Sequence, residues 1–331
     1  MLKNEFTFPS GDGKTSVHTM EWLPEGEVRG VLQVAHGVSE YAGRYAPLAE
    51  FLTERGWAVA ANDHIGHGQS MTPGAPTAHF TSADTVVDDM YTLRNLEGKK
   101  FPDRPYFFLG HSMGSYLVRS YLIRRPGTLA GAIIMGTGQM RPLDIAYCLL
   151  VARRDAVRYG WEHTSPAVNR LSFNKYNKIF RPTRTDYDWL SADPGNVDRY
   201  IADPLCGADA SLALCRETLH LMRDVQKPKN LRRMDLSTPV LFLSGSMDPV
   251  GGCGRETARA FNSFRQAGVR DVRMKLYPGA RHEILNDACR QLVFKDVSIW
   301  CEAHISAADS ADVPAFSQRP GPADAKFQSV P

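Results

Sequence analysis

The sequence predicts an α/β fold in which a mostly parallel, doubly wound sheet carries helices on both faces. Short apolar segments alternate with helical patterns along most of the 331 residues, as parallel crossovers require. The first two strand patterns follow each other without a helix between them, which predicts an antiparallel N-terminal edge. Residues 137–232 interrupt the alternation, and we interpret them as a helical cap inserted between two core strands.

The expected strands are short runs that are either apolar or alternate between apolar and polar residues. They cover residues 5–8, 16–22, 29–35, 57–62, 105–109, 131–136, 239–244 and 272–277. Helical spacing predicts core helices over 45–55, 84–98, 114–124, 254–267 and 288–304. Within the cap, helical patterns run from Leu143 to Tyr159 and from Ala210 to Val225.

These elements divide the chain into four parts. A first core part (1–136) is followed by the cap (137–232) and a second core part (233–305). The remaining tail, 306–331, is rich in Ala, Ser, Asp and Pro and poor in large apolar residues, which predicts disorder.

Residues 110–114 read Gly-His-Ser-Met-Gly and lie between a strand pattern and a helical pattern. G-x-S-x-G in this context is typical of a nucleophile elbow. The sharp turn strains the serine backbone, and the two glycines remove Cβ atoms that would collide with their neighbours. The following helix begins at the serine, where its N-terminus favours negative charge. Ser112 is therefore the candidate nucleophile, with a plain glycine-rich turn as the alternative.

A serine hydroxyl needs a base, and the base needs an orienting acid. With an elbow of this kind both are expected later in the chain, acid before histidine, each just after a strand. Asp248 follows the apolar run at 240–243, and His282 follows the alternating run at 272–277. Order and placement therefore favour Asp248 as the acid and His282 as the base. For Asp248 the alternative is a turn-forming role before Pro249.

Three rival residues are less well placed. Asp144 follows the strand pattern at 131–136 and could supply an acid from there. Asp235 precedes its strand and so lies at the wrong end of the sheet, and His304 falls in the terminal helical pattern.

An oxyanion hole needs two backbone N–H groups aimed at the developing charge. One is expected from Met113, the residue after the candidate nucleophile, and the other from the loop after the strand at 29–35. Gly37 lets that loop turn tightly, which makes the Val38 N–H the second expected donor. For His36 we favour a structural role under the loop, because the base is already assigned.

The chain resembles the monoacylglycerol lipase and lysophospholipase branch of the α/β-hydrolases, which overlaps the serine aminopeptidase-like hydrolases. The resemblance covers residues 28–136 and 237–304 and is weak between them. It is carried by His36-Gly37-Val38-Ser39-Glu40, Arg44-Tyr45, the segment 62–70, the elbow at 110–114, the segment 245–250, and Ala280-Arg281-His282-Glu283.

The resemblance implies an α/β-hydrolase fold, ester hydrolysis of acyl substrates, a triad of Ser112, Asp248 and His282, and donors at Val38 and Met113. At Val38 the loop departs from the commonest variants, which carry a small residue there, so we expect a narrower acyl mouth. Other residues near these motifs are expected to support the site rather than react: His36, Gly37, Glu40, Asp63 and His111.

Composition excludes several classes of protein. A net charge of +3 is too mild to indicate a nucleic-acid partner. None of the six cysteines forms a Cys-x-x-Cys pair or a Cys/His cluster with metal spacing, so we expect reduced thiols and neither metal nor cofactor. The N-terminus lacks a signal-peptide pattern, and no stretch reaches the ~20 apolar residues of a membrane span. A cytoplasmic protein is expected.

The predicted function is two-step hydrolysis of a monoacylglycerol or lysophospholipid ester through an acyl-enzyme. A small-ester carboxylesterase, a thioesterase and an aminopeptidase stay open, as does a non-catalytic relative that binds a small molecule. The aminopeptidase alternative rests on acidic cap residues that could bind an amine: Glu162, Asp186, Asp188, Asp193, Asp198, Asp203 and Asp209.

The cap also raises the question of a lipid partner. Its first helical pattern carries an apolar stripe, which either makes transient contact with a lipid surface or packs on the core, and we favour packing. The stripe consists of Ile145, Leu149, Ala152 and Ala156. The oligomeric state does not follow from the sequence.

Overall fold

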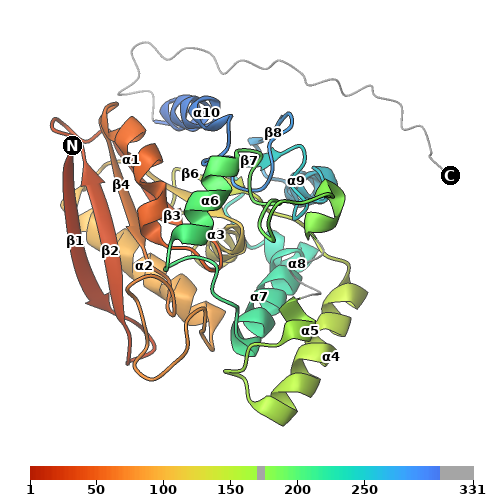
Figure 1. The fold of residues 1–331 in the computed structure, drawn as a ribbon. Coiled ribbons are helices and arrows are strands. Elements are labelled where there is room, and N and C mark those ends of the chain that lie inside the picture. The colour runs from red at the N-terminus through yellow and green to blue at the C-terminus, as the bar shows by residue number, and fades with distance from the viewer. Residues whose placement is uncertain (170–175, 306–331) are drawn as a thin grey trace, which may run out of the picture.

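The computed structural model describes residues 1–169 and 176–305 (Figure 1), so the predicted tail lies outside the described residues. Its centre is one eight-stranded sheet in the order β1-β2-β4-β3-β5-β6-β7-β8. β2 is antiparallel to both β1 and β4, and the other paired strands are parallel, which confirms the predicted antiparallel edge. The strands are β1 Leu2–Pro9, β2 Ser16–Leu23, β3 Gly30–Ala35, β4 Trp57–Asn62, β5 Tyr106–His111, β6 Gly131–Met135, β7 Val240–Gly245 and β8 Val272–Tyr277.

Helices cover both faces of the sheet (Figure 1), as a doubly wound fold requires. Side chains of α1 (Ala46–Thr53) and α10 (Arg290–Glu302) pack on one face. The opposite face is covered by α2 (Ala83–Lys100), α3 (Met113–Arg124) and α9 (Arg255–Ala267). Strands β3 to β7 are buried along their whole length because both faces are covered.

Most predicted boundaries agree with the structure to within a few residues, but one difference matters for the site. We predicted that a strand ends at residue 109, whereas β5 continues to His111. Gly110 and His111 stay in the ladder because they pair with Ile134 and Met135 of β6. Ser112 therefore follows the strand directly. A further short 3-10 helix, η1 (Ala42–Tyr45), precedes α1 and was not predicted separately.

The described elements between β6 and β7 are helical. In Figure 1 α4, α5, α7 and α8 lie at the lower right, and α6 lies near the centre. α7 packs on α3 of the core and on α4. Only α4 and α7 are long enough to show helical periodicity, so the shorter elements were not predicted. The elements are α4 Pro142–Tyr159, α5 Pro166–Asn169, η3 Tyr176–Phe180, α6 Pro194–Ala202, α7 Leu212–Val225 and α8 Pro228–Leu231.

Apolar side chains of α4 lie on both its buried and its exposed side. Ile145, Ala152 and Ala156 of the predicted stripe are buried, so this stripe packs inward. On the outer side Leu143, Leu150 and Val157 are 82%, 66% and 83% exposed, and Tyr147 is exposed as well. Among the described residues, no helix is both long enough and apolar enough to cross a bilayer.

A buried acidic pair lies where α2 crosses the antiparallel edge. Glu97 of α2 is fully buried, and Glu21 of β2 is nearly so. The Lys100 ammonium donates to both carboxylates, at 2.9 Å to Glu97 and 2.7 Å to Glu21. Burial, followed by the contact with Glu21, raises the pKa of Glu97 to about 8.

Replacing Glu97 by Gln should weaken the pH dependence of stability. The folded-state pKa of Glu97 lies above its ordinary value of 4.5, so its ionisation opposes folding. The free energy of unfolding should therefore fall as pH rises from 4.5 towards 8, by about 1 kcal/mol or more from this group. Urea unfolding at both ends of that range would measure the difference.

The matched control is Glu54→Gln, at a side chain that is 74% exposed. This variant should keep the wild-type pH dependence. An unchanged pH dependence in Glu97→Gln would contradict the assignment.

Candidate active site

Ser112 occupies a strained turn between β5 and α3. Its backbone has φ 54° and ψ −117°, outside the conformations that L-residues ordinarily adopt. A Cβ added to Gly110 would collide with the Gly114 carbonyl, and one added to Gly114 would collide with the Ala35 carbonyl. The turn therefore needs glycine at both positions, for the steric reason that the motif predicts.

His282 and Asp248 meet at the carboxyl edge of the sheet, in the loops that follow β8 and β7. Nδ1 of His282 lies 3.0 Å from Oδ1 of Asp248, and both side chains are buried. The carboxylate also accepts hydrogen bonds from the Val250 N–H and the Ser244 hydroxyl, which hold it in place. Nε2 of His282 is buried and has no partner among the described residues. This arrangement leaves Nε2 available to exchange a proton.

The rival residues are engaged elsewhere. Asp144 accepts two hydrogen bonds from Arg141 at the start of α4. Asp235 accepts from the Ser237 hydroxyl in the turn before β7, and His304 contacts Asp271. The structure thus brings His282 together with Asp248 and with none of these three.

Two chambers meet at Ser112. The first, which we call the polar chamber, has a volume of about 220 Å³ and is lined by Ser112, Asp186, Tyr187, Tyr200, Asp209 and His282, among others. The second, the apolar chamber, has a volume of about 110 Å³ and is lined by Ser112, Met113, Tyr116, Leu214, Leu219 and Met222, among others. Val38 and Trp189 line both chambers. A molecule with an apolar and a polar half therefore fits across the serine.

The predicted oxyanion donors lie beside the serine. Met113 is the first residue of α3, where backbone N–H groups lack intrahelical partners. A Cβ on Gly37 would lie 3.1 Å from the Ser112 Cβ, so the loop after β3 passes directly by the serine. The Gly37 N–H is already bonded to the Glu40 carboxylate at 2.6 Å. The next amide along that loop is that of Val38.

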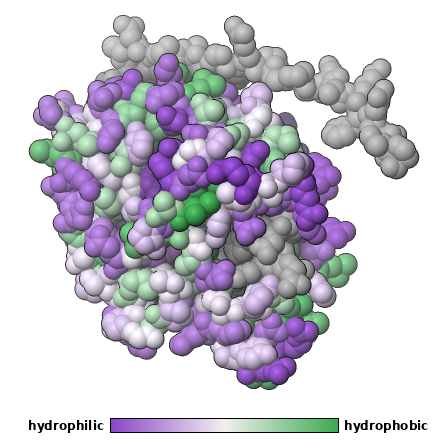
Figure 2. Space-filling view, viewed as in Figure 1, coloured by the Kyte–Doolittle hydropathy of each residue, from purple (hydrophilic) through white to green (hydrophobic). Residues whose placement is uncertain are grey.

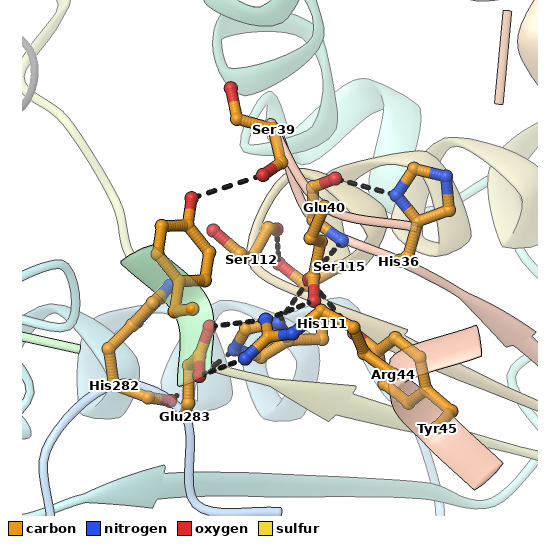
Figure 3. Close-up of polar contacts among 12 residues, drawn as sticks. His36, Ser39, Glu40, Arg44, Tyr45, His111, Ser112, Ser115, His282 and Glu283 are labelled. Carbon is orange, nitrogen blue, oxygen red and sulfur yellow. Dashed lines mark hydrogen bonds and ion pairs between the residues drawn. The ribbon is translucent and has the colours of Figure 1, made fainter. Parts of the chain in front are cut away.

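A group of buried ionic side chains lies beside Ser112 and His282 (Figure 3). Arg44 donates to Glu40 at 2.8 Å and binds both carboxylate oxygens of Glu283 at 2.6 and 2.7 Å. All three side chains are at most 9% exposed. We call Glu40, Arg44, His111 and Glu283 the buried ion cluster.

His111 completes the charge balance of the buried ion cluster. Its Nδ1 lies 3.0 Å from the Glu40 carboxylate, and its Nε2 lies 3.4 Å from the backbone carbonyl of His282. Both ring nitrogens face acceptors, which favours the doubly protonated ring. Burial lowers the pKa of His111, but the Glu40 carboxylate outweighs burial and the net shift is upward. With His111 protonated, two cations balance two carboxylates.

Sequence reasoning named Glu40 and His111 as supporting residues but missed the roles of Arg44 and Glu283. Two signals could have found them. Arg44 lies four residues after Glu40, and Glu283 directly follows the candidate base. The sequence does not show that Arg44 and Glu283, which are 239 residues apart, meet in one cluster.

His36 and Asp63 brace the loops around the site. His36 accepts a hydrogen bond from the His64 N–H at 2.9 Å. Asp63 accepts from the Ala42 and Gln69 N–H groups, both at 2.8 Å. In this structure both side chains contact loop backbone. Over residues 1–169 and 176–305, no group of three or more His, Cys, Asp or Glu side chains is arranged to hold a metal ion.

Comparisons with known proteins agree on one family. A family model described as serine aminopeptidase, S33, matches residues 26–288. The chain is 29% identical to the monoacylglycerol lipase of Mycolicibacterium smegmatis over 309 residues, which cover 92% of this chain and 98% of that protein. It is 27% identical to human monoglyceride lipase over 300 residues, 88% of this chain and 89% of the relative.

A similar solved structure is that of a thermostable carboxyl esterase from Bacillus coagulans in complex with glycerol. It aligns with a TM-score of 0.85 and 29% identity, over 92% of this chain and all of that one. The similarity therefore includes the segment between β6 and β7.

Replacing Arg44 by Met should destabilise the protein by about 3 kcal/mol or more, because it leaves two buried carboxylates without their cation. Urea unfolding would measure the loss. Arg223→Met is the matched control, since Arg223 contacts a 46% exposed Asp224 and such pairs contribute at most about 1 kcal/mol. Equal effects of the two substitutions would contradict the role given to the buried ion cluster.

Proposed function

Because this chain belongs to the serine aminopeptidase S33 family of α/β-hydrolases, we propose that it hydrolyses carboxylic esters of the monoacylglycerol or lysophospholipid type. The observation that carries the proposal is the pair of chambers that meet at Ser112. The apolar chamber fits an acyl chain, and the polar chamber fits the alcohol that is released. The relatives named monoacylglycerol lipase and monoglyceride lipase, and the esterase solved with glycerol, support this substrate class.

In the proposed first step, Nε2 of neutral His282 takes the Ser112 proton while Oγ attacks the ester carbonyl. Asp248 holds the imidazole in the required tautomer and stabilises its charged form. The contact at 3.0 Å between these two residues and the unpartnered Nε2 support their roles. The N–H groups of Val38 and Met113 stabilise the oxyanion.

In the second half of the reaction, protonated His282 gives its proton to the departing alcohol, which leaves through the polar chamber. A water molecule, activated by the same histidine, then cleaves the acyl-enzyme and releases the fatty acid. Every proton passes through His282, so no cofactor takes part in this scheme.

Hydrolysis of p-nitrophenyl esters with two to sixteen acyl carbons tests the proposal. We expect activity to peak at medium or long chains, and Ser112→Ala to lower kcat by about 10⁴-fold or more. Ser237→Ala, in the exposed turn before β7, is the control and should keep full activity. A peak at acetate or butyrate would indicate a small-ester carboxylesterase instead. Turnover that does not depend on Ser112 would contradict the proposed nucleophile.

We further propose that the outer surface of α4, formed by Leu143, Tyr147, Leu150 and Val157, makes transient contact with lipid. All four side chains are more than half exposed, and the same helix also carries Arg153, Arg154 and Arg158. In Figure 2 hydrophobic residues lie among hydrophilic ones at the lower right margin, where Figure 1 places α4. The inner side of the helix contributes Cys148 to the apolar chamber. One helix thus connects the surface with the acyl site.

The triple substitution of Leu143, Leu150 and Val157 by Ser should lower binding to phospholipid vesicles by about tenfold or more, since each buried leucine contributes over 1 kcal/mol. Co-sedimentation would measure the binding. Hydrolysis of soluble p-nitrophenyl butyrate should stay unchanged. Leu292→Ser, at a 49% exposed position on α10, is the control, and an equal loss in both variants would contradict the assignment to α4.

A further inference from the structure

The polar chamber carries two carboxylates that the proposed reaction does not use. Asp186 and Asp209 are both exposed and both line the chamber. Among the described residues neither forms an ion pair with a cationic side chain. Asp186 directly precedes Tyr187 in the chain, and Tyr187 and Asp209 line the same chamber. Burial raises the pKa of the Tyr187 hydroxyl, and both carboxylates raise it further. They therefore place two negative charges near Tyr187, in the wall of the chamber.

The other carboxylates near the chamber have partners. Glu40 and Glu283 also line it, but their carboxylates are bound by Arg44 within the buried ion cluster. The Asp248 carboxylate is buried and bonded to His282. Among the described carboxylates that line the chamber, Asp186 and Asp209 are thus the exposed ones without a cationic partner.

The walls between these carboxylates are aromatic. The Tyr187 and Tyr200 rings lie 5.3 Å apart, and Trp189 lies 5.1 Å from the ring of His282. Hydrogen bonds fix the tyrosines, from Tyr200 to the Ser39 carbonyl and from Tyr187 to the Gly207 carbonyl. The Arg44 guanidinium already lies 4.9 Å from the centre of the Tyr200 ring, so Tyr187 and Trp189 are the aromatic residues that we consider for a ligand cation. Aromatic faces attract quaternary ammonium groups.

The same chamber is open to the reacting atoms. His282 lines it, is 2% exposed, and has an Nε2 without a partner in the described part of the chain. His282 gives its proton to the departing alcohol in the proposed reaction. A group bound near Tyr187 and Trp189 therefore belongs to the alcohol half of the ester.

We propose that the polar chamber selects esters whose alcohol half carries an ammonium group, with Asp186 and Asp209 as the positioning residues. This inference rests on the proposed function, because Ser112 and His282 define which half of the ester is the alcohol. Relative to a neutral alcohol such as glycerol it favours an amino alcohol, and it disfavours alcohols that carry a net negative charge. Carboxylates at a solvated rim act over roughly 10 Å at about 0.1 M salt and over less at higher salt, so the selection weakens as salt is added.

Three esters with one acyl chain test this selection: butyrylcholine, its neutral isostere 3,3-dimethylbutyl butyrate, and the anionic 3-(butyryloxy)propanoate. We expect kcat/KM to be at least tenfold higher for the cation than for the neutral ester, and lowest for the anion. The double variant Asp186→Asn/Asp209→Asn should remove about tenfold of this preference by raising KM for butyrylcholine. Its kcat/KM for the neutral ester should stay within twofold. Asp198→Asn is the control, because Asp198 is paired with Arg184 and does not line the chamber.

Binding separates this inference from the proposed function. In the Ser112→Ala variant, calorimetric titration should show choline binding about tenfold more tightly than 3,3-dimethylbutan-1-ol, and the two Asn substitutions should abolish the difference. Equal binding of the two alcohols, or a preference that survives both substitutions, would overturn the inference. Failure of wild-type protein to hydrolyse any ester of the p-nitrophenyl series would overturn the proposed function, while the titration would still decide the charge selection.

Discussion

The buried guanidinium of Arg44 joins parts of the candidate site that lie far apart in the sequence. It binds Glu40 in the loop after β3 and Glu283 in the loop after β8. Glu283 in turn accepts a hydrogen bond from Asn196 of α6, so the segment between β6 and β7 is tied to the same group. A buried charge is stable only when it is paired. Moving any of these loops away from Arg44 would leave a buried charge unpaired and would therefore cost much free energy. The position of His282 follows, since its neighbour in the chain is held by Arg44.

Around this cluster, separate parts of the fold provide separate parts of the site. The sheet and α3 provide the strained serine, and the loops after β7 and β8 provide the acid and the histidine. The segment between β6 and β7 provides most of both chamber walls, through α4, α7 and the residues around Tyr187. Ser112, Asp248 and His282 thus all lie just after strands of the sheet, while most residues that line the two chambers lie in the segment between β6 and β7.

Sequence patterns predicted the core well because its signals are local. Buried strands and helical spacing are visible within a few residues, and the elbow places glycines where the backbone leaves no room for a Cβ. The chamber walls could not be predicted in this way. Asp186 and Asp209 looked like any other acidic residues of the cap, and their meeting at Tyr187 depends on the path of the intervening chain. The contact between His111 and Glu40 could not be predicted for the same reason, since 71 residues separate the two in the sequence.

The proton on His111 has a consequence for the site as a whole. The pKa of this ring is raised in the folded protein, so folding takes up a proton near neutral pH, and the gain in stability is lost as pH rises through that pKa. In alkaline solution the cluster then holds two carboxylates against one guanidinium, directly beside the His282 backbone. Loss of that proton at high pH therefore leaves an unbalanced carboxylate next to the residue that precedes Ser112 in the chain and beside the loop that carries His282.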